Sequence, residues 1–279
     1  MSKYLNESLP INKREGQIGF NKDGEKMKII EYNTYDDIIV KFLDGNNCEV
    51  HTQYVNFQKG IVKNYNKIVY GKHGYLGQGP YASEHRDENG KRILHNEYAI
   101  WKGIHERVGN FDGKHPSYID VTVNEIWWCY QNFAGWYNEH RYDTGDDFLC
   151  VDKDLLIPGN REYAPDKCCL IPNSINEIFR NYVNYKRTDD GLPTGVHRRT
   201  DSKSIRYRTE GIYLDEWGNK CKIRKTFTNV LEAFIFYKEY KELYIQQLAN
   251  KYKDKLDPKV YDILMKYKIC TDVDFSKFI

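Results

Sequence analysis

Asp152, Lys153 and Asn176 are the residues whose types and spacing favour chemistry. Asp152 comes directly after residues 148–151, a short apolar run that is typical of a buried strand. Residues 168–171 predict a second strand, and the Pro-Asn-Ser sequence that follows predicts a helix whose first turn holds Asn176. Such a strand–strand–helix (ββα) unit can bring an acid at the end of its first strand close to an amide on its helix. Because hard divalent cations prefer oxygen ligands, we expect an open cation site here.

The same segment resembles a known nuclease motif. The matching residues are Val151, Asp152, Lys153, Asp154, Gly159, Asn160, Tyr163, Ala164, Pro165, Cys168, Pro172, Asn173 and Asn176. They resemble the HNH (His-Me finger) motif, most closely a variant common in phage proteins. The resemblance implies metal-dependent hydrolysis of phosphodiester bonds in DNA, with Mg²⁺ or Mn²⁺ held by Asp152 and Asn176 and with Lys153 in the catalytic centre.

Lys153 stands where this family has its general-base histidine. Beside Asp152 and Asp154 a lysine keeps its charge, so it is better suited to hold a phosphate than to remove a proton. Asp154 and His140 are the alternative bases that the sequence offers. A ββα unit kept only as a DNA-docking scaffold is the non-catalytic alternative.

A second resemblance lies further along the chain. Residues 205–208, 211–214 and 222–227 predict three strands, and a following helix is predicted to begin at a Thr228 cap and to end near Tyr252. The matching residues are Pro193, Gly195, Val196, Phe227, Thr228, Glu232, Ala233 and Tyr237. They resemble the Apetala-type DNA-binding domain of plant transcription factors and phage homing endonucleases, which implies that this sheet binds duplex DNA.

The charge of the three predicted strands supports the same interpretation. Nine Lys and Arg residues stand against four Asp and Glu residues between positions 197 and 225. Because alternate residues of a strand share a face, Arg206 with Arg208 and Lys222 with Arg224 would project together. Such a sheet can contact phosphates and guanine edges in the major groove, although a merely solvated charged face is the alternative. The predicted DNA-binding residues are Arg198, Arg199, Lys203, Arg206, Arg208, Lys222, Arg224 and Lys225.

Composition limits the remaining classes of protein. At 279 residues the chain exceeds the usual size of a single domain, and its net charge of +2 means that any nucleic-acid surface is local. The seven cysteines include no C-x-x-C pair, so we predict neither a zinc site nor disulfides. We see no signal peptide and no membrane-spanning run. The sequence therefore predicts a cytoplasmic protein without a membrane partner, in the host cytoplasm if phage-encoded.

The first half of the chain predicts supporting elements. Residues 27–32, 37–42 and 48–52 predict strands of a small SH3-like β-module, which either contacts DNA or protein or is purely structural. The glycine-rich residues 71–79 lack the Gly-Lys-Ser/Thr that a phosphate loop needs, so we interpret them as a linker. Aromatic residues at helical spacing predict helices over residues 96–108 and 126–137, and a short helix is expected over residues 258–267.

We therefore predict an α+β protein of three parts. Residues 1–65 form the small β-module, residues 66–187 an HNH-like ββα domain with a linker and aromatic helices, and residues 188–279 a three-stranded sheet with helices. The leading hypothesis is a phage-type, homing-type DNA endonuclease or nickase that acts on double-stranded DNA. The alternative is a non-catalytic DNA-binding regulator, or a phage accessory or anti-defence protein, on a degenerate nuclease scaffold. A host protein partner ranks below both.

Overall fold

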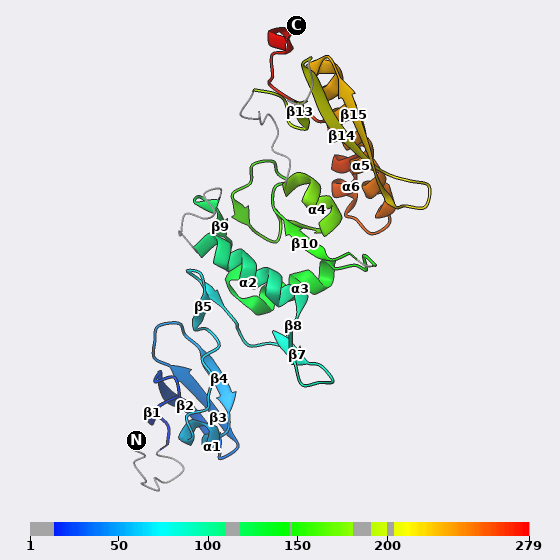
Figure 1. Cartoon of the computed structure of the whole chain (residues 1–279). Coiled ribbons are helices and arrows are strands. Elements are labelled where there is room, and N and C mark those ends of the chain that lie inside the picture. Colours follow the sequence, from blue (N-terminus) through cyan, green and yellow to red (C-terminus); the bar gives the residue numbers. More distant parts are fainter. Residues whose placement is uncertain (1–13, 110–117, 146, 181–190, 200–203, 279) are drawn as a thin grey trace. The chain divides into compact units, whose positions relative to one another are not determined.

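The computed structural model of the chain describes residues 14–109, 118–145, 147–180, 191–199 and 204–278 (Figure 1). Helices and short antiparallel sheets alternate along the chain, which confirms the α+β class. The chain divides into two compact units, residues 1–138 and 139–279. Within the described ranges, no helix is both long and apolar enough to cross a membrane.

The first unit begins with a four-stranded antiparallel sheet whose strands follow sequence order. Its elements are β1 (Ile18–Phe20), β2 (Lys26–Thr34), β3 (Asp37–Phe42), β4 (Glu49–Thr52) and helix α1 (Tyr54–Gln58). Alternation along β2 and β3 buries Met27, Ile29, Ile38 and Val40 in one core, which Phe57 of α1 completes. The strands predicted between residues 27 and 52 are confirmed, and the SH3-like assignment stays a prediction.

Short hairpins and two helices make up the rest of the first unit. Their bounds are β5 (Ile68–Tyr70), β6 (Gly74–Tyr75), β7 (Glu84–Arg86), β8 (Arg92–Leu94), α2 (Asn96–Gly109), β9 (Thr122–Val123), η3 (Glu125–Trp128) and α3 (Tyr130–His140), the last of which continues into the second unit. Trp101, Trp127 and Phe133 are almost completely buried among other aromatic rings, with Trp127 edge-on to Phe133 at 5.1 Å. The predicted aromatic stripes are therefore core.

The helix predicted over residues 126–137 is broken. A short 3₁₀ helix, η3, ends at Trp128, and the extended backbone of Cys129 (φ −82°, ψ 122°) separates it from α3. The carbonyl of Trp127 explains the break. It accepts hydrogen bonds from Trp101 Nε1 (2.8 Å) and His105 Nε2 (3.0 Å). These two side chains of α2 therefore occupy the oxygen that would accept a backbone hydrogen bond if the helix continued.

The glycine-rich stretch is a packed segment rather than the predicted linker. An added Cβ at Gly79 would lie 2.3 Å from Gln131 Oε1, and one at Gly77 would also collide with neighbours on the α3 side. Gln131 itself accepts from Tyr81 N (3.0 Å) and donates to Tyr81 O (2.9 Å). These glycines therefore allow the chain to lie directly against Gln131, which explains their number without a phosphate ligand.

The second unit contains the ββα segment and the C-terminal sheet. Its elements are β10 (Leu149–Asp152), β11 (Glu162–Tyr163), β12 (Cys169–Pro172), α4 (Asn173–Arg180), β13 (Val196–Arg199), β14 (Arg206–Leu214), β15 (Lys220–Phe227), α5 (Val230–Lys251), α6 (Pro258–Lys266) and η4 (Phe275–Phe278). β10 pairs antiparallel with β12, and α4 follows and packs against both strands. The strand–strand–helix order predicted around Asp152 is thus observed, as are the helix ends near residues 252 and 267.

The C-terminal sheet has the order β13-β14-β15, with α5 packed on one face. Two of the three predicted strands are in fact one, because Gly211 continues β14 instead of forming a turn. A Cβ at Gly211 would lie 2.5 Å from Cγ of Tyr240, so the glycine admits the α5 ring. The sheet still has three strands, because residues 196–199, which were not predicted as a strand, form β13. The cap of α5 is Asn229, which accepts from Leu231 N (2.7 Å), and the predicted Thr228 cap is wrong.

One hydrophobic core joins the ββα segment to the C-terminal sheet and helices. Ile171 and Ile175 from β12 and α4 are buried in the same cluster as Tyr207 of β14 and Leu248 of α5. Asp147 adds a polar link, because its Oδ2 accepts from Ser174 N at 3.0 Å and from the Tyr252 hydroxyl at 3.4 Å. The division into residues 1–65, 66–187 and 188–279 stays a prediction.

Candidate functional site

The face of the C-terminal sheet away from α5, here called the outer face, is lined with basic side chains. Residues that pair directly across antiparallel strands project to the same face. Arg206 pairs with Arg199, Arg208 with His197, and the rows continue through Arg224 and Lys222. The buried residues Tyr207 and Thr209 alternate with these and lie on the α5 face. Arg199, Arg206, Arg208, Lys222 and Arg224 therefore share the outer face, and all are exposed.

Two of the predicted DNA-binding residues lie on the α5 face of the sheet, and a third is not described. Arg198 pairs with Tyr207, which places it on the α5 face of the sheet. Lys225 is on that face as well, because it pairs with Thr209 and its Nζ lies 5.0 Å from the centre of the Phe236 ring. Lys203 lies outside the described residues. The register therefore divides a set that the sequence could only group together.

One acid interrupts the outer face. Glu210 pairs directly with Arg224, whose Nε donates to Glu210 Oε1 at 2.8 Å. The hydrogen bond from Arg224 lowers the pKa of Glu210, with Lys222 and Arg208 adding to the effect. Both partners are exposed, so this ion pair contributes at most about 1 kcal/mol and is easily exchanged for a phosphate. The face therefore keeps an excess of positive charge.

Asp152 ends β10, and its carboxylate accepts hydrogen bonds through one oxygen. Oδ1 accepts from the backbone amides of Asp154 (2.9 Å) and Leu155 (2.6 Å), and among the described residues no hydrogen bond reaches Oδ2. Burial raises the pKa of Asp152, and the two amide bonds only partly oppose this. A desolvated carboxylate with one unused oxygen is suited to bind a cation.

Lys153 is held in place by its own loop. Its Nζ donates to Asp154 Oδ2 (2.7 Å) and to the carbonyl of Asn160 (2.9 Å), and only 11% of its side chain is exposed. In return, Asn160 Nδ2 donates to the carbonyl of Lys153 at 2.9 Å. This reciprocal clamp closes the loop between the two strands. An ammonium with two acceptors is a poor base, so the contacts favour a structural role for Lys153.

Asn176 lies in α4, between the buried residues Ile175 and Ile178. No hydrogen bond between its side chain and that of Asp152 occurs in the described part of the chain. α4 packs against both β10 and β12, so Asp152 and Asn176 lie on neighbouring elements, and their pairing as ligands stays a prediction. Asp152 is three residues, about 10 Å, from the end of the hairpin where α4 begins, and α4 packs back over both strands. Asn176 lies three residues into α4, so the helix covers about 4.5 Å of this 10 Å distance.

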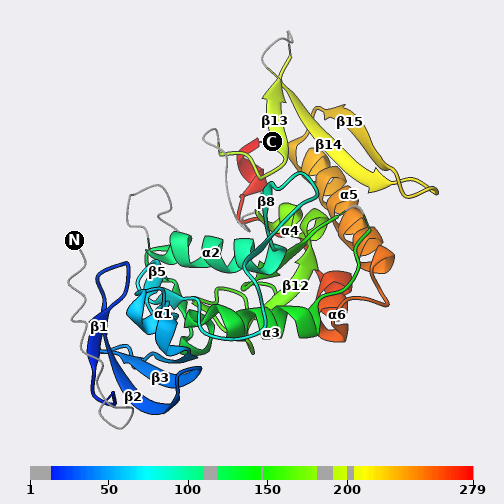
Figure 2. The same cartoon turned by 90° about the horizontal axis from the view of Figure 1, so that it is seen from below.

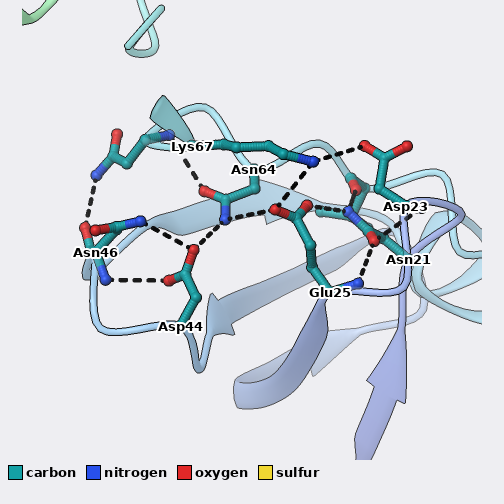
Figure 3. Close-up of polar contacts among 9 residues, drawn as sticks. Asn21, Asp23, Glu25, Asp44, Asn46, Asn64 and Lys67 are labelled. Carbon is teal, nitrogen blue, oxygen red and sulfur yellow. Dashed lines mark hydrogen bonds and ion pairs between the residues drawn. The ribbon is translucent and has the colours of Figure 1, made fainter. Parts of the chain in front are cut away.

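The N-terminal sheet carries a separate cluster of polar side chains (Figure 3). Asn21 Oδ1 accepts from Glu25 N at 2.8 Å, and Asn64 Nδ2 donates to Asp44 Oδ2 at 2.6 Å and to Glu25 Oε1 at 3.4 Å. Lys67 lies 3.5 Å from the Glu25 carboxylate. Burial alone would raise the pKa of Asp44, but hydrogen bonds from Asn46 and Asn64 lower it. These carboxylates have protein partners, so the cluster ties the turns of the sheet to residues 64–67.

Comparisons with known proteins identify no relative: no family model matches the chain, and neither a curated protein nor a solved structure is detectably similar to it. In the part of the chain that the structure describes, no group of three His, Cys, Asp or Glu side chains is placed to hold a metal ion. The alternative bases remain separate features: Asp154 is paired with Lys153, and His140 is an exposed residue at the end of α3.

Sequence reasoning missed three residues that the structure makes prominent. Asp147 links α4 to the end of α5, Lys241 is a largely buried lysine of α5, and Trp217 is 77% exposed in the turn between β14 and β15. Trp217 alone had a local signal, because it stands in a polar Asp-Glu-Trp-Gly-Asn turn. Asp147 depends on partners 27 and 105 residues away, and Lys241 depends on the packing of α5.

Proposed function

We propose that the protein binds duplex DNA through the outer face of β13, β14 and β15. The observation that carries this proposal is the register, which places Arg206, Arg208, Lys222 and Arg224 on one face with a single acid among them. Like charges on neighbouring strand positions repel each other, and a phosphate backbone would relieve this repulsion. The major groove admits a two-stranded β-ribbon such as β14 with β15.

Binding of the full-length protein to a labelled duplex, measured by fluorescence anisotropy, tests the proposal. Affinity should fall steeply between about 50 and 200 mM salt, because bound phosphates release counterions. Replacing both Arg206 and Arg208 by Ala should weaken binding and reduce the slope of log K against log salt by about 1.8. Lys253→Ala/Lys259→Ala removes two exposed charges of the same unit outside the sheet, and should change neither.

A second candidate function is metal-dependent nicking of the bound DNA at the ββα segment. The observation in its favour is the desolvated Asp152 at the end of β10, whose Oδ2 has no hydrogen-bond partner among the described residues, on a strand that α4 packs against. Asp152 and Asn176 would hold Mg²⁺ or Mn²⁺, with water and phosphate oxygens as further ligands. When bound, the ion would neutralise charge on the scissile phosphate. The hydrogen bonds that hold Lys153 in its loop favour the non-catalytic alternative, because this lysine stands where the HNH family has its general base.

A plasmid-nicking assay separates the two alternatives. Asp152→Asn preserves the Oδ1 acceptor for the two loop amides, and should abolish nicking in Mg²⁺ or Mn²⁺ while DNA affinity stays equal or rises slightly. Asp166→Ala, an exposed acid of the same loop, is the matched control and should nick normally. Wild-type protein that binds DNA but never nicks it in either metal would support the non-catalytic DNA-binding alternative.

A further inference from the structure

The turn between β14 and β15 presents an exposed indole. Trp217 is 77% exposed, whereas Trp101 and Trp127 are 1% exposed and Trp136 is 9% exposed. In both views the turn projects from the end of the two strands (Figures 1 and 2). An aromatic side chain of this size is normally buried, because its exposure to water forgoes a large hydrophobic gain. The exposure of Trp217 therefore requires a reason.

The turn holds Trp217 in a fixed position. Asp215 Oδ1 accepts from the amides of Trp217 (3.0 Å) and Asn219 (2.8 Å), and Asp215 N donates to the carbonyl of Asn219 at 3.0 Å. Gly218 takes the left-handed conformation that the turn needs, with φ +82°. At the stem of the turn, Gln247 of α5 bonds both the N–H and the carbonyl of Leu214. The indole is therefore displayed on a pre-organised support, which reduces the entropy cost of binding.

Uncompensated positive charge lies at the base of the same turn. Lys220 Nζ sits 5.6 Å from the centre of the Tyr244 ring, and Lys241 is close enough for the two lysines to repel. Burial, with a contribution from Lys220, lowers the pKa of Lys241 to about 8. Within the described ranges neither lysine forms an ion pair with a carboxylate. Both lysines lie on the α5 side of the sheet, away from the outer face.

The spacing connects the turn to the outer face. The last basic row, in which Ile212 pairs with Lys222, lies two strand residues before Leu214, the last residue of β14, about 7 Å away. Trp217 therefore lies just beyond the end of the basic rows, within reach of a base that leaves the stack of DNA bound to the outer face.

We propose that Trp217 stacks on an unpaired or unstacked base of the DNA that the outer face binds. This inference rests on the proposed binding of duplex DNA. The π-face of any base can stack on an indole, so Trp217 adds preference for distorted DNA rather than for a sequence. Glu216 beside the indole repels phosphate and keeps the tip from binding the backbone unspecifically.

The test compares a perfect duplex with the same duplex carrying a one-nucleotide bulge, using the full-length protein. Wild type should bind the bulged duplex more tightly than the perfect duplex. Trp217→Ala should reduce the ratio of the two affinities about fivefold or more, because stacking of a base on an aromatic ring contributes at least about 1 kcal/mol. Trp217→Phe should retain most of it. The salt slope should stay unchanged in Trp217→Ala, since no charge is removed, and this separates the variant from the Arg206/Arg208 pair.

Tryptophan fluorescence gives a second readout that does not depend on affinity. Trp217 is the most exposed tryptophan among the described residues, so acrylamide should quench its fluorescence in the free protein. On the bulged duplex the stacked base should shield the indole, and quenching should decrease. The difference between wild type and Trp217→Phe isolates this signal.

If wild type binds DNA with a steep salt slope while Trp217→Ala keeps the bulge preference and the quenching is unchanged, this inference fails and the DNA-binding proposal stands. If wild type binds no DNA, both fail. If Trp217→Ala dissociates a dimer in the absence of DNA, the indole contacts a second copy and the inference is overturned.

Discussion

Asp147 shows how one side chain can join distant parts of the second unit. Its carboxylate accepts from Ser174 N at the start of α4, from Phe148 N (2.8 Å) and from the Tyr252 hydroxyl. Burial alone would raise the pKa of Asp147, but the bonds from Ser174, Phe148 and Tyr252 outweigh it and lower the pKa. The ionised form therefore stabilises the fold, much as a helix cap does.

Replacing Asp147 by Ala should lower the free energy of unfolding by about 1 kcal/mol at pH 7, the usual effect of losing a cap. Because the folded-state pKa of Asp147 is lowered, its contribution is complete above the unfolded pKa of about 3.9 and disappears as the pH falls through the folded value. Urea unfolding at several pH values measures this. Asp166→Ala is the control, and an Asp147→Ala deficit that persisted unchanged at pH 2 would contradict the assignment.

Among the elements, the packing of α5 against the sheet depends on glycines. Gly195 and Gly211 lie where the rings of Tyr237 and Tyr240 approach, at distances that leave no room for a Cβ. Thr209, fully buried between them in sequence, donates its hydroxyl to the carbonyl of Gly195 at 2.8 Å. The helix can therefore lie close to the sheet on one side, and the basic residues are left on the other.

Gly211→Ala should lower the free energy of unfolding by about 1–3 kcal/mol, because the new methyl group overlaps the Tyr240 ring. The same substitution in a Tyr240→Ala background should cost much less, since the colliding ring is gone. Chemical unfolding of the four proteins of this double-mutant cycle gives the coupling. Additive effects in the two backgrounds would show that the close approach of ring and glycine does not determine the packing.

For the molecule as a whole, the shared core sets the smallest fragment that can fold. The C-terminal sheet and helices bury Ile171, Ile175 and Ile178 from the ββα segment together with their own residues. A fragment that begins after that segment would expose this apolar surface to water, at a cost of about 25 cal/mol for each Å².

A fragment of residues 139–279 should therefore melt cooperatively, whereas one of residues 188–279 should not. Circular dichroism during heating measures both, and the full-length protein is the reference. A cooperative transition for residues 188–279, with a native-like spectrum, would support the predicted domain boundary at residues 187 and 188 and would contradict the requirement for the shared core. Soluble expression of each fragment is checked by size-exclusion chromatography before heating.

The sequence by itself determined the elements that local pattern encodes. Strand alternation located β2, β3 and β15, helical spacing located α2 and α5, and the apolar runs beside Asp152 located β10 and β12. These succeed because burial follows the period of the element, which neighbours in sequence reveal. The shared face of Arg206 and Arg208 was predictable for the same reason.

Only the tertiary structure decided what depends on a partner far along the chain. The role of Gly211 as a continuous strand residue follows from the ring of Tyr240, and the break before α3 follows from donors on α2. The face on which Lys225 lies follows from its register with Thr209, which one residue of slip would reverse. The clamp on Lys153 and the reach of Asp147 to Ser174 and Tyr252 are contacts of the same kind. Local pattern carries no record of them, because the free energy that fixes each one arises between residues the chain brings together only on folding.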